Sequence, residues 1–193
     1  MSTTQPIRDR EQLERFRNYY KYEEPKPRNY AMIVLGLNSA LRISDILALR
    51  WKDVYMRECG CYRQHIDVIE KKTGKENVFA LNPPAVEALE LYRTSIGTYN
   101  ESRYIFCSQK YPYEALSRSQ AFRIIKKAAG QCGLDSHISC HSLRKTFGYF
   151  AWKNGVPPAL LMNIYNHSSY EITKRYLCID QLEKDEVFMK IFL

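Results

Sequence analysis

The stretch QHIDVIEKKTGKENVFAL, residues 64–81, decides the fold class of this 193-residue chain. Its outer parts, residues 64–70 and 76–81, alternate apolar and polar side chains as half-buried strands do. The five residues between them, KKTGK, include Gly74, which suits a tight turn. A β-hairpin is therefore predicted here, within a chain whose other patterns are helical.

Helical periodicity surrounds the hairpin on both sides. The best-marked helix begins at Ser117, which has capping-box spacing to Gln120, and it can end at Gly130 or Gly133. The other expected helices span residues 10–22, 28–41, 43–50, 82–93, 141–155, 157–165, 168–177 and 180–193. We predict an α+β fold: one mainly α-helical domain over residues 1–193 with a small antiparallel β-sheet.

The composition is basic, with 29 Lys and Arg against 21 Asp and Glu and a formal net charge of +8. This charge favours a polyanionic partner, nucleic acid before membrane, although a merely basic soluble protein would share it.

The amino terminus lacks a secretion signal and no apolar run could span a bilayer, so a cytoplasmic protein is expected. The six cysteines form no CxxC pair and are expected to stay reduced. CGCYRQH, residues 59–65, matches no common zinc spacing, so no metal site is predicted.

Four places put cationic or proton-transferring side chains at turns or element ends, and each signal is weak alone. Arg42 is followed three residues later by Asp45, which by itself reads as a surface ion pair. The hairpin tip carries lysines at positions 71, 72 and 75. HSLRKT, residues 141–146, places a histidine and an arginine on one helical face. NHSSYEITKRYL, residues 166–177, has a histidine nine residues ahead of a tyrosine.

Taken in this order, Arg42, a lysine in a β-turn, His141 with Arg144, His167 and Tyr176 resemble the catalytic set of the tyrosine recombinases, the phage integrase family. The resemblance extends to the surrounding stretches ALRISDILALRWKDV, KKTGK, HSLRKTF and NHSSYEITKRYL. It implies the catalytic-domain fold of that family. It also implies an enzyme that cleaves and rejoins DNA strands through a covalent 3′-phosphotyrosyl intermediate, in integration, excision or inversion.

The resemblance assigns the central roles, and phosphoryl-transfer chemistry agrees with them. Tyr176 is the expected nucleophile, and Arg42 and Arg144 are expected to bind the non-bridging phosphate oxygens through their planar guanidinium groups. No metal and no other cofactor is expected, because the arginines supply the positive charge and one phosphate ester is exchanged for another.

The remaining matched residues would handle protons and support the site. Lys72 precedes the Thr-Gly of the turn and is the expected general acid for the 5′ oxygen, with Lys75 as the alternative. His141 and His167 would assist proton transfer or bond the phosphate. Asp45 would orient its neighbours.

Two features depart from the family pattern. Asn166 stands before His167 where the family commonly has glycine, but asparagine tolerates a left-handed backbone. Only about 27 residues, a short extension and helix, precede the first matching helix, where larger members carry a separate clamp domain. The grip on double-stranded DNA is then expected from basic residues of this domain, acting mainly on phosphates: Lys52, Lys75, Arg118, Arg123, Lys126, Lys127, Lys145, Lys174 and Arg175.

The C-terminal tail, residues 180–193, ends in an apolar cluster formed by Val187, Phe188, Met189, Ile191, Phe192 and Leu193. In the family such a segment often docks on a neighbouring protomer of a tetramer. Packing on the chain's own core is the alternative.

Two other functions fit part of the pattern. A type IB topoisomerase uses the same chemistry without a partner site, but the stretches quoted above look more like integrases. A catalytically silent DNA-binding regulator would keep the fold and lose the reaction. All the expected reactive positions are filled, which favours the enzyme.

Overall fold

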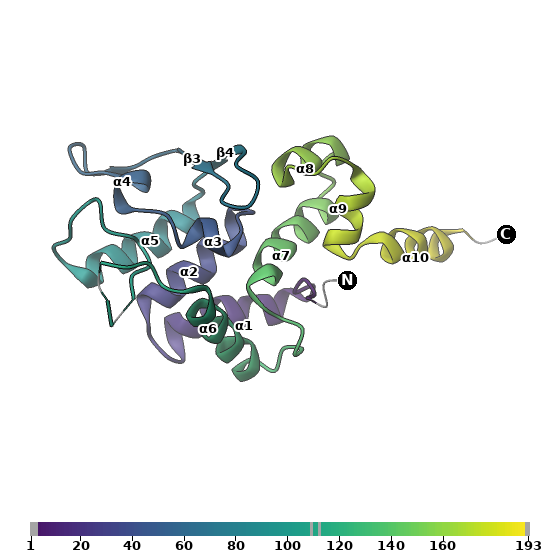
Figure 1. Cartoon of the computed structure of the whole chain (residues 1–193). Helices are drawn as coiled ribbons and strands as arrows, with labels where there is room; N and C mark the ends of the chain where they lie inside the picture. Colours follow the sequence, from purple (N-terminus) through teal and green to yellow (C-terminus); the bar gives the residue numbers. More distant parts are fainter. Residues whose placement is uncertain (1–3, 109, 112, 192–193) are drawn as a thin grey trace.

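Figure 1 shows a mostly helical molecule, and this computed structural model describes residues 4–108, 110–111 and 113–191. The α+β prediction is confirmed, because the strands form two small antiparallel sheets among many helices. The helices are α1 (Arg10–Tyr22), α2 (Pro27–Asn38), α3 (Ile43–Ile46), α4 (Trp51–Val54), α5 (Pro83–Ile96), α6 (Arg118–Gln131), α7 (Cys140–Lys153), α8 (Pro158–Tyr165), α9 (Tyr170–Leu177) and α10 (Asp180–Lys190). The strands are β1 (Tyr55–Met56), β2 (Cys61–Tyr62), β3 (His65–Ile69) and β4 (Glu76–Ala80).

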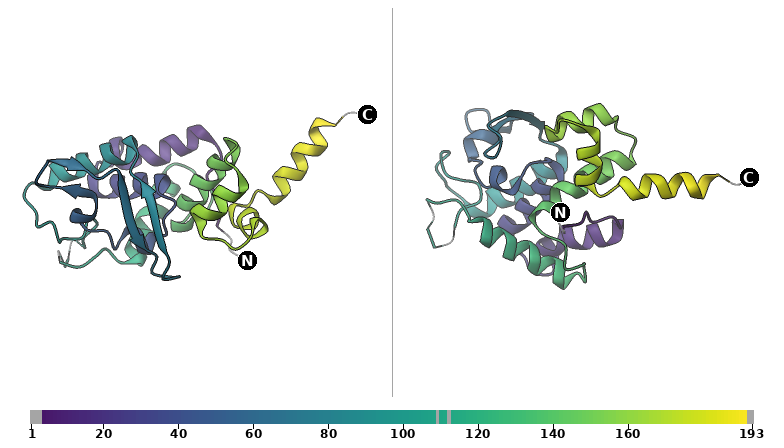
Figure 2. Two further views of the ribbon diagram at one scale, coloured as in Figure 1. Left: turned by 90° about the horizontal axis from the view of Figure 1, so that it is seen from above. Right: turned by 45° about the vertical axis from the view of Figure 1, so that its right-hand side comes forward.

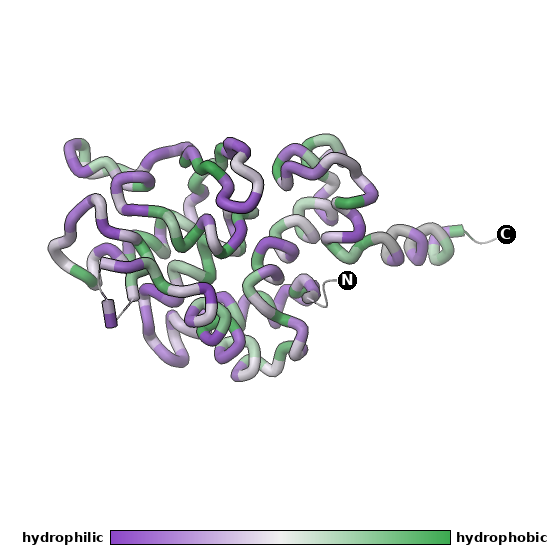
Figure 3. Tube along the Cα trace, in the orientation of Figure 1, coloured by the Kyte–Doolittle hydropathy of each residue, from purple (hydrophilic) through white to green (hydrophobic). Residues whose placement is uncertain are grey.

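The larger hydrophobic core is built around α2, which is apolar nearly all round. Met32, Ile33 and Leu35 are fully buried there, and α2 packs against α1, α5 and α7. A helix with this composition is stable only when other elements surround it. In Figure 3 the hydrophobic, green stretches lie mainly where these helices meet, and hydrophilic stretches mark the turns.

A second, smaller core joins the later part of α7 to α8 and α9, and its buried members are Ala40, Tyr149, Tyr165, Leu177 and Ile179. Figures 1 and 2 show α8 and α9 at one end of the molecule and α4 and α5 at the other. Leu143 of α7 belongs to the larger core and Tyr149 to the smaller one. The helix α7 therefore runs through the seam between two packed groups of helices.

Two glycines allow the helices to approach closely at this seam. A Cβ atom added to Gly36 of α2 would lie 2.5 Å from Leu143 Cδ1. A Cβ atom added to Gly148 of α7 would lie 2.4 Å from Leu177 Cδ2 at the end of α9. Both distances are far below van der Waals contact. The position of α7 therefore depends on the absence of a Cβ atom at Gly36 and Gly148.

The predicted hairpin is present, with β3 and β4 paired from His65 opposite Ala80 to Ile69 opposite Glu76. Gly74 in its turn has φ +68°, a left-handed conformation that glycine adopts without strain. The predicted capping box at the start of α6 is also confirmed, with reciprocal hydrogen bonds between the Ser117 and Gln120 side chains and the backbone.

The helix expected over residues 43–50 is wrong in extent, because α3 ends at Ile46. Leu49 accepts a hydrogen bond from the amide of Ile105, and the Trp51 amide donates to the Arg103 carbonyl. This strand-like pairing interrupts the helical pattern, and α4 begins after it. The hairpin of β1 and β2 was not predicted, since strands of two residues carry no periodicity.

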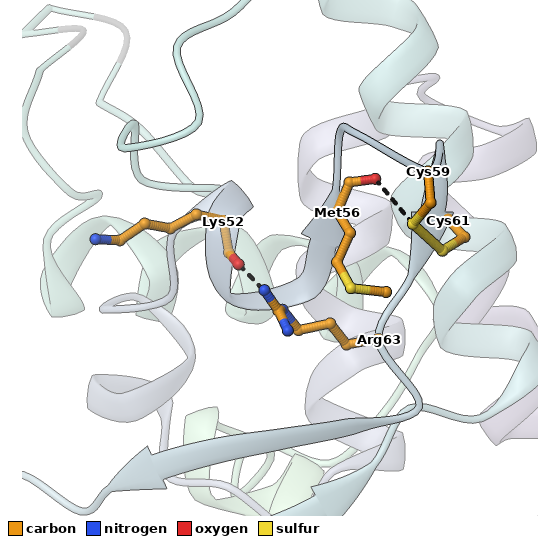
Figure 4. The surroundings of a disulfide bond; sticks show 5 residues. All are labelled: Lys52, Met56, Cys59, Cys61 and Arg63. Atoms are coloured by element: carbon orange, nitrogen blue, oxygen red, sulfur yellow. Dashed lines mark hydrogen bonds between the residues drawn. A yellow bond between two sulfur atoms is a disulfide. The ribbon is translucent and has the colours of Figure 1, made fainter.

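Cys59 and Cys61 form a disulfide across Gly60, which corrects the expectation that all six cysteines are reduced (Figure 4). Gly60 has φ +65°, and the turn brings the two Cα atoms to 5.5 Å, a distance that suits a disulfide. The other four cysteines are free thiols, at positions 107, 132, 140 and 178. In the described part of the chain, no group of three or more metal-binding side chains occurs.

The helix α10 extends away from the rest of the molecule (Figures 1 and 2). Phe188, Met189 and Ile191 are 78%, 72% and 58% exposed, so these three do not pack on the chain's own core. The side chain of Val187, and Phe192 and Leu193, lie outside the described residues. Over residues 4–191, apart from the two undescribed positions, no helix has the length and hydropathy needed to cross a membrane.

Candidate active site

Three elements that are far apart in the sequence meet at one open cavity of about 650 Å³. Arg42 is the N-cap residue of α3, Lys72 lies in the β3–β4 turn, and His141 lies in the first turn of α7. Lys71 and Arg118 add two positive charges to the wall, and the described lining residues include no carboxylate. The cavity therefore suits an anion.

Arg144, His167 and Tyr176 form a second group, stacked around Tyr165. The His167 and Tyr176 rings meet edge to face with centroids 5.4 Å apart. Each ring also contacts Tyr165, at centroid distances of 5.4 and 5.6 Å. The Arg144 guanidinium lies 4.6 Å from the centre of the Tyr165 ring, a cation–π distance.

Backbone hydrogen bonds fix Arg144 in this group. It is 2% exposed, and its Nη2 donates to the Tyr165 carbonyl at 3.2 Å. The Tyr165 hydroxyl donates to the Arg144 carbonyl at 2.6 Å. The other terminal nitrogen of Arg144, Nη1, is buried and has no hydrogen-bond partner. A buried cationic donor without a partner is costly, so this nitrogen is a ready site for an incoming anion.

Asn166 makes the His167 turn possible. It ends α8 with φ 54° and ψ 35°, the left-handed conformation expected of asparagine in place of glycine. The next helix, α9, begins after Ser169, whose side chain accepts from the Ile172 amide. This short turn places His167 against the helix that carries Tyr176.

Glu70 connects the two groups, and it was not predicted as a site residue from the sequence. Its carboxylate lies 2.6 Å from Arg42 Nη1 and 3.9 Å from Arg144 Nη1, and it is fully buried. Thr73 Oγ1 donates to it at 2.6 Å. The only sequence signal is its position directly before the KKTGK turn, where a glutamate normally reads as a solvated charge.

Asp45 holds the other side of the same turn. It is 1% exposed, and its Oδ1 accepts a hydrogen bond from the Lys71 amide at 3.0 Å. Its Oδ2 is buried without a hydrogen-bond partner. The carboxylate thus ties the residue before Lys72 to the helix that follows Arg42.

The pKa shifts of the tyrosine and the two histidines determine their charge in the DNA-free protein. Desolvation, helped by the charges of Arg144 and Arg42, lowers the pKa of His167 to about 4. Desolvation and nearby cations also lower the pKa of His141. Burial raises the pKa of Tyr176, although the charges of Arg144 and Arg42 oppose this. At neutral pH the phenol is protonated and both imidazoles are neutral.

The hydrogen bonds of His167 indicate which ring nitrogen is protonated. Its Nδ1 lies 3.1 Å from Thr173 Oγ1, and that hydroxyl is placed to donate to the Ser169 carbonyl at 3.2 Å. Because the threonine has one proton, we infer that it accepts from Nδ1–H. The lone pair of Nε2 is then available for proton transfer.

The candidate DNA contacts differ in exposure. Six of the nine are exposed: Lys52, Lys75, Arg118, Arg123, Lys127 and Arg175. Lys127 already pairs with Glu24 at 2.7 Å, and half-buried Lys126 donates to the Ser136 carbonyl. Half-buried Lys174 lies with its Nζ 5.5 Å from the Tyr170 ring centre. Only the exposed cations are well placed for phosphates.

Lys145 is not a surface contact, which corrects the prediction. It is 1% exposed, and its Nζ donates to the Thr4 carbonyl at 2.6 Å and lies 5.3 Å from the centre of the Tyr176 ring. On α7 this residue follows Arg144 and therefore points about 100° away, toward the N-terminal segment and α9. It is a buried cation beside the candidate nucleophile.

The whole arrangement can bind and attack a phosphodiester. Two guanidinium groups converge on Glu70, and both are close enough to the Tyr176 phenol for their charges to oppose the rise in its pKa. A lysine, Lys72, lies in a turn on the same cavity as Arg42. Guanidinium groups stabilise the charge of a phosphoryl-transfer transition state, and a phenol can act as the nucleophile.

Comparison with known proteins shows the family of this chain. The model of the phage integrase family matches residues 8–183. The probable integrase/recombinase YoeC of Bacillus subtilis is 37% identical over 181 residues, which cover 94% of this chain and 93% of that protein. The fimbriae regulatory protein FimE of Escherichia coli is 28% identical, with 77% and 73% covered.

Longer relatives match over part of their length. A tyrosine recombinase of Pseudothermotoga lettingae is 29% identical over 85% of this chain, which spans 54% of that protein. Among solved structures, XerA recombinase superposes with a TM-score of 0.76 at 19% identity over 98% of this chain and 65% of that one. XerH bound to its difH substrate gives 0.73 at 21% identity, over 97% and 53%. The chain belongs to the phage integrase family, the tyrosine recombinases.

Proposed function

We propose that this chain is a site-specific DNA recombinase that uses Tyr176 to cut DNA and to rejoin it, in integration, excision or inversion. The observation that carries the proposal is the stacking of Arg144, His167 and Tyr176 into one cluster that Glu70 joins to Arg42. Family membership supports the same chemistry, since the similar YoeC is named as a probable integrase/recombinase.

Each chemical step of the proposal is assigned to a residue. The Tyr176 oxygen attacks phosphorus and forms the 3′-phosphotyrosyl bond as the bond to the 5′ oxygen breaks. Arg42 and Arg144 hold the non-bridging oxygens, and loss of one such donor costs on the order of 10² to 10³ in rate. The departing 5′ oxygen takes a proton from Lys72. Rejoining reverses these transfers with another strand's 5′ hydroxyl.

The phenol proton also needs an acceptor. His167 is neutral at pH 7 because its pKa is lowered to about 4, and its Nε2 keeps a lone pair. Its ring lies edge to face against Tyr176. We assign proton acceptance to His167, and His141, on the cavity wall beside Lys72, to a hydrogen bond with the phosphate.

Double-stranded DNA is the proposed substrate, and the exposed cations around the cavity would bind its phosphates. XerH and the Tn1549 integrase, which share the fold, were solved with DNA. We further propose that α10 docks on a second copy in a tetramer. Three large apolar side chains, Phe188, Met189 and Ile191, are exposed on this projecting segment.

Covalent trapping tests the proposal directly. The protein is incubated with a nicked duplex whose cut strand diffuses away after cleavage, drawn from DNA that flanks its gene, and SDS-resistant adducts are measured. Wild type should form an adduct and Tyr176→Phe should not. Tyr170→Phe, at the start of the same helix, is the matched control and should retain it.

Two outcomes would favour other functions. Specific DNA binding without any adduct would support the catalytically silent regulator. Rapid relaxation of supercoiled DNA by the protein alone, without pairing of two sites, would support a topoisomerase.

A further inference from the structure

Glu70 is the carboxylate on which both arginines converge. Among the residues that the structure describes, it is the only acidic side chain within 4.0 Å of either Arg42 or Arg144. It is fully buried, so it is not part of the surface that DNA could reach in the free protein.

A carboxylate is needed here because two neighbouring arginines, one of them almost completely buried, are costly without a negative charge between them. Arg144 is almost completely buried, and placing Arg42 beside it adds repulsion between like charges. A carboxylate between the two offsets both costs. Burial alone would raise the pKa of Glu70, but hydrogen bonds from Thr73 and Arg42 and the charge of Arg144 outweigh burial and lower it. Glu70 is therefore ionised at neutral pH.

The same carboxylate also fixes the β3–β4 turn. Thr73 Oγ1 donates to it at 2.6 Å and Asn77 Nδ2 at 3.4 Å. The Glu70 carbonyl accepts from the Gly74 amide at 2.8 Å, which closes the turn around Lys72. One side chain thus links the two guanidinium groups to the loop that carries the lysine.

We propose that Glu70 is a positioning residue that aligns Arg42, Arg144 and the Lys72 turn, and that its negative charge weakens phosphate binding in the ground state. This inference rests on the proposed recombinase chemistry. It predicts opposite effects on binding and on cleavage, because removal of the charge strengthens attraction for an anion while it loosens the alignment that the transition state needs.

Glu70→Gln is the informative change, because glutamine keeps the size and can still accept from Thr73. Cleavage of the nicked duplex at saturating DNA should slow by about 10- to 100-fold, the range typical of outer groups that orient a charged site. In a Tyr176→Phe background, affinity for the duplex and for inorganic phosphate should increase several-fold. Glu70→Asp, which keeps the charge, should recover part of the cleavage rate.

Glu76→Gln is the matched control, since Glu76 is an exposed carboxylate on the same hairpin, at the start of β4. It should change neither quantity, and thermal unfolding will show whether each variant is folded. Binding and cleavage that weaken together in Glu70→Gln, or that both stay at the wild-type level, would overturn the positioning role.

The two proposals can fail separately. A wild-type protein that forms no adduct refutes the recombinase function, whatever Glu70 does. In that case the phosphate-binding measurement still judges the electrostatic part, since an unchanged affinity in Glu70→Gln would refute it.

Discussion

Gly148→Ala should lower both the stability of the domain and the rate of cleavage, because it displaces the proposed nucleophile, Tyr176. The added Cβ would lie 2.4 Å from Leu177 Cδ2 and 2.5 Å from the Tyr165 hydroxyl, where about 3.5 to 4.0 Å is needed. The Leu177 and Tyr165 side chains must therefore shift by about 1 Å, and because both are fully buried, we expect the end of α9 to move with them. Tyr176 immediately precedes Leu177, so the proposed nucleophile would move with it.

The magnitudes follow from two opposing effects. Alanine gains about 1 kcal/mol over glycine in a helix interior, whereas overpacking costs about 1 to 3 kcal/mol. Gly130→Ala on α6 isolates the first effect, because nothing lies within 4 Å of its added Cβ. By urea unfolding, Gly148→Ala should be less stable than Gly130→Ala by about 1 to 3 kcal/mol.

Adduct formation provides the second measurement. A displacement of about 1 Å at a reacting group can lower the rate by about 10²-fold, so Gly148→Ala should cleave slowly at temperatures where it is fully folded. Gly130→Ala should cleave at the wild-type rate. A Gly148→Ala protein with wild-type stability and cleavage would refute the close contact between α7 and α9.

Three further predictions concern individual charges. By NMR titration, His167 should show a pKa near 4 in the DNA-free protein. Because this pKa is below the unfolded value, the contribution of His167 to stability should be full above about pH 6.5 and should decrease as the pH falls toward 4. His167→Gln should remove that part of the decrease. Arg118→Ala should weaken binding to any duplex and reduce the slope of log affinity against log salt by about 1, measured by fluorescence anisotropy in a Tyr176→Phe background. Lys145→Met should leave that slope unchanged because the ammonium is buried, and a reduction equal to that of Arg118→Ala would contradict its burial.

The parts of the fold that the sequence predicted are those with a local cause. The β3–β4 hairpin follows from alternation and Gly74, and the start of α6 follows from Ser117 and Gln120. The end of α3 was not predictable, because pairing of Leu49 with Ile105 is a contact between distant residues. The disulfide of Cys59 and Cys61 was missed because redox compartment and spacing both indicated free thiols.

In the candidate site, too, features that depend on the sequence order were predicted and features that depend on contacts between distant residues were not. The order of the candidate residues along the chain can be read without a structure, so Arg42 and Tyr176 could be named as candidate catalytic residues from a resemblance alone. Lys145 was misplaced because the rotation of α7 about its axis depends on what covers it, and here the N-terminal segment does. Glu70 was missed because a carboxylate beside lysines looks solvated until Arg42 and Arg144 are seen to enclose it.

The geometry divides the candidate active site into two half-sites, and the contacts within each are shorter than the contact between them. Arg42 is tied to the Lys72 turn by the 2.6 Å contacts of Glu70, while Arg144 is tied to the Tyr176 cluster by Tyr165 and by the close packing at Gly148. Between these half-sites the contact of Arg144 with Glu70 is longer, at 3.9 Å against 2.6 Å for Arg42. Nη1 of each arginine is buried without a hydrogen-bond partner.

A phosphate that binds both arginines would bridge the two half-sites and would supply hydrogen-bond acceptors to both Nη1 atoms. DNA binding would then complete the alignment of Tyr176 with Lys72 that Glu70 begins in the free protein. The neutral phenol and the neutral imidazole of the DNA-free site agree with this order of events. An enzyme that makes a covalent bond to its substrate would gain from this order, because the proposed nucleophile would become competent only where a phosphodiester is already held.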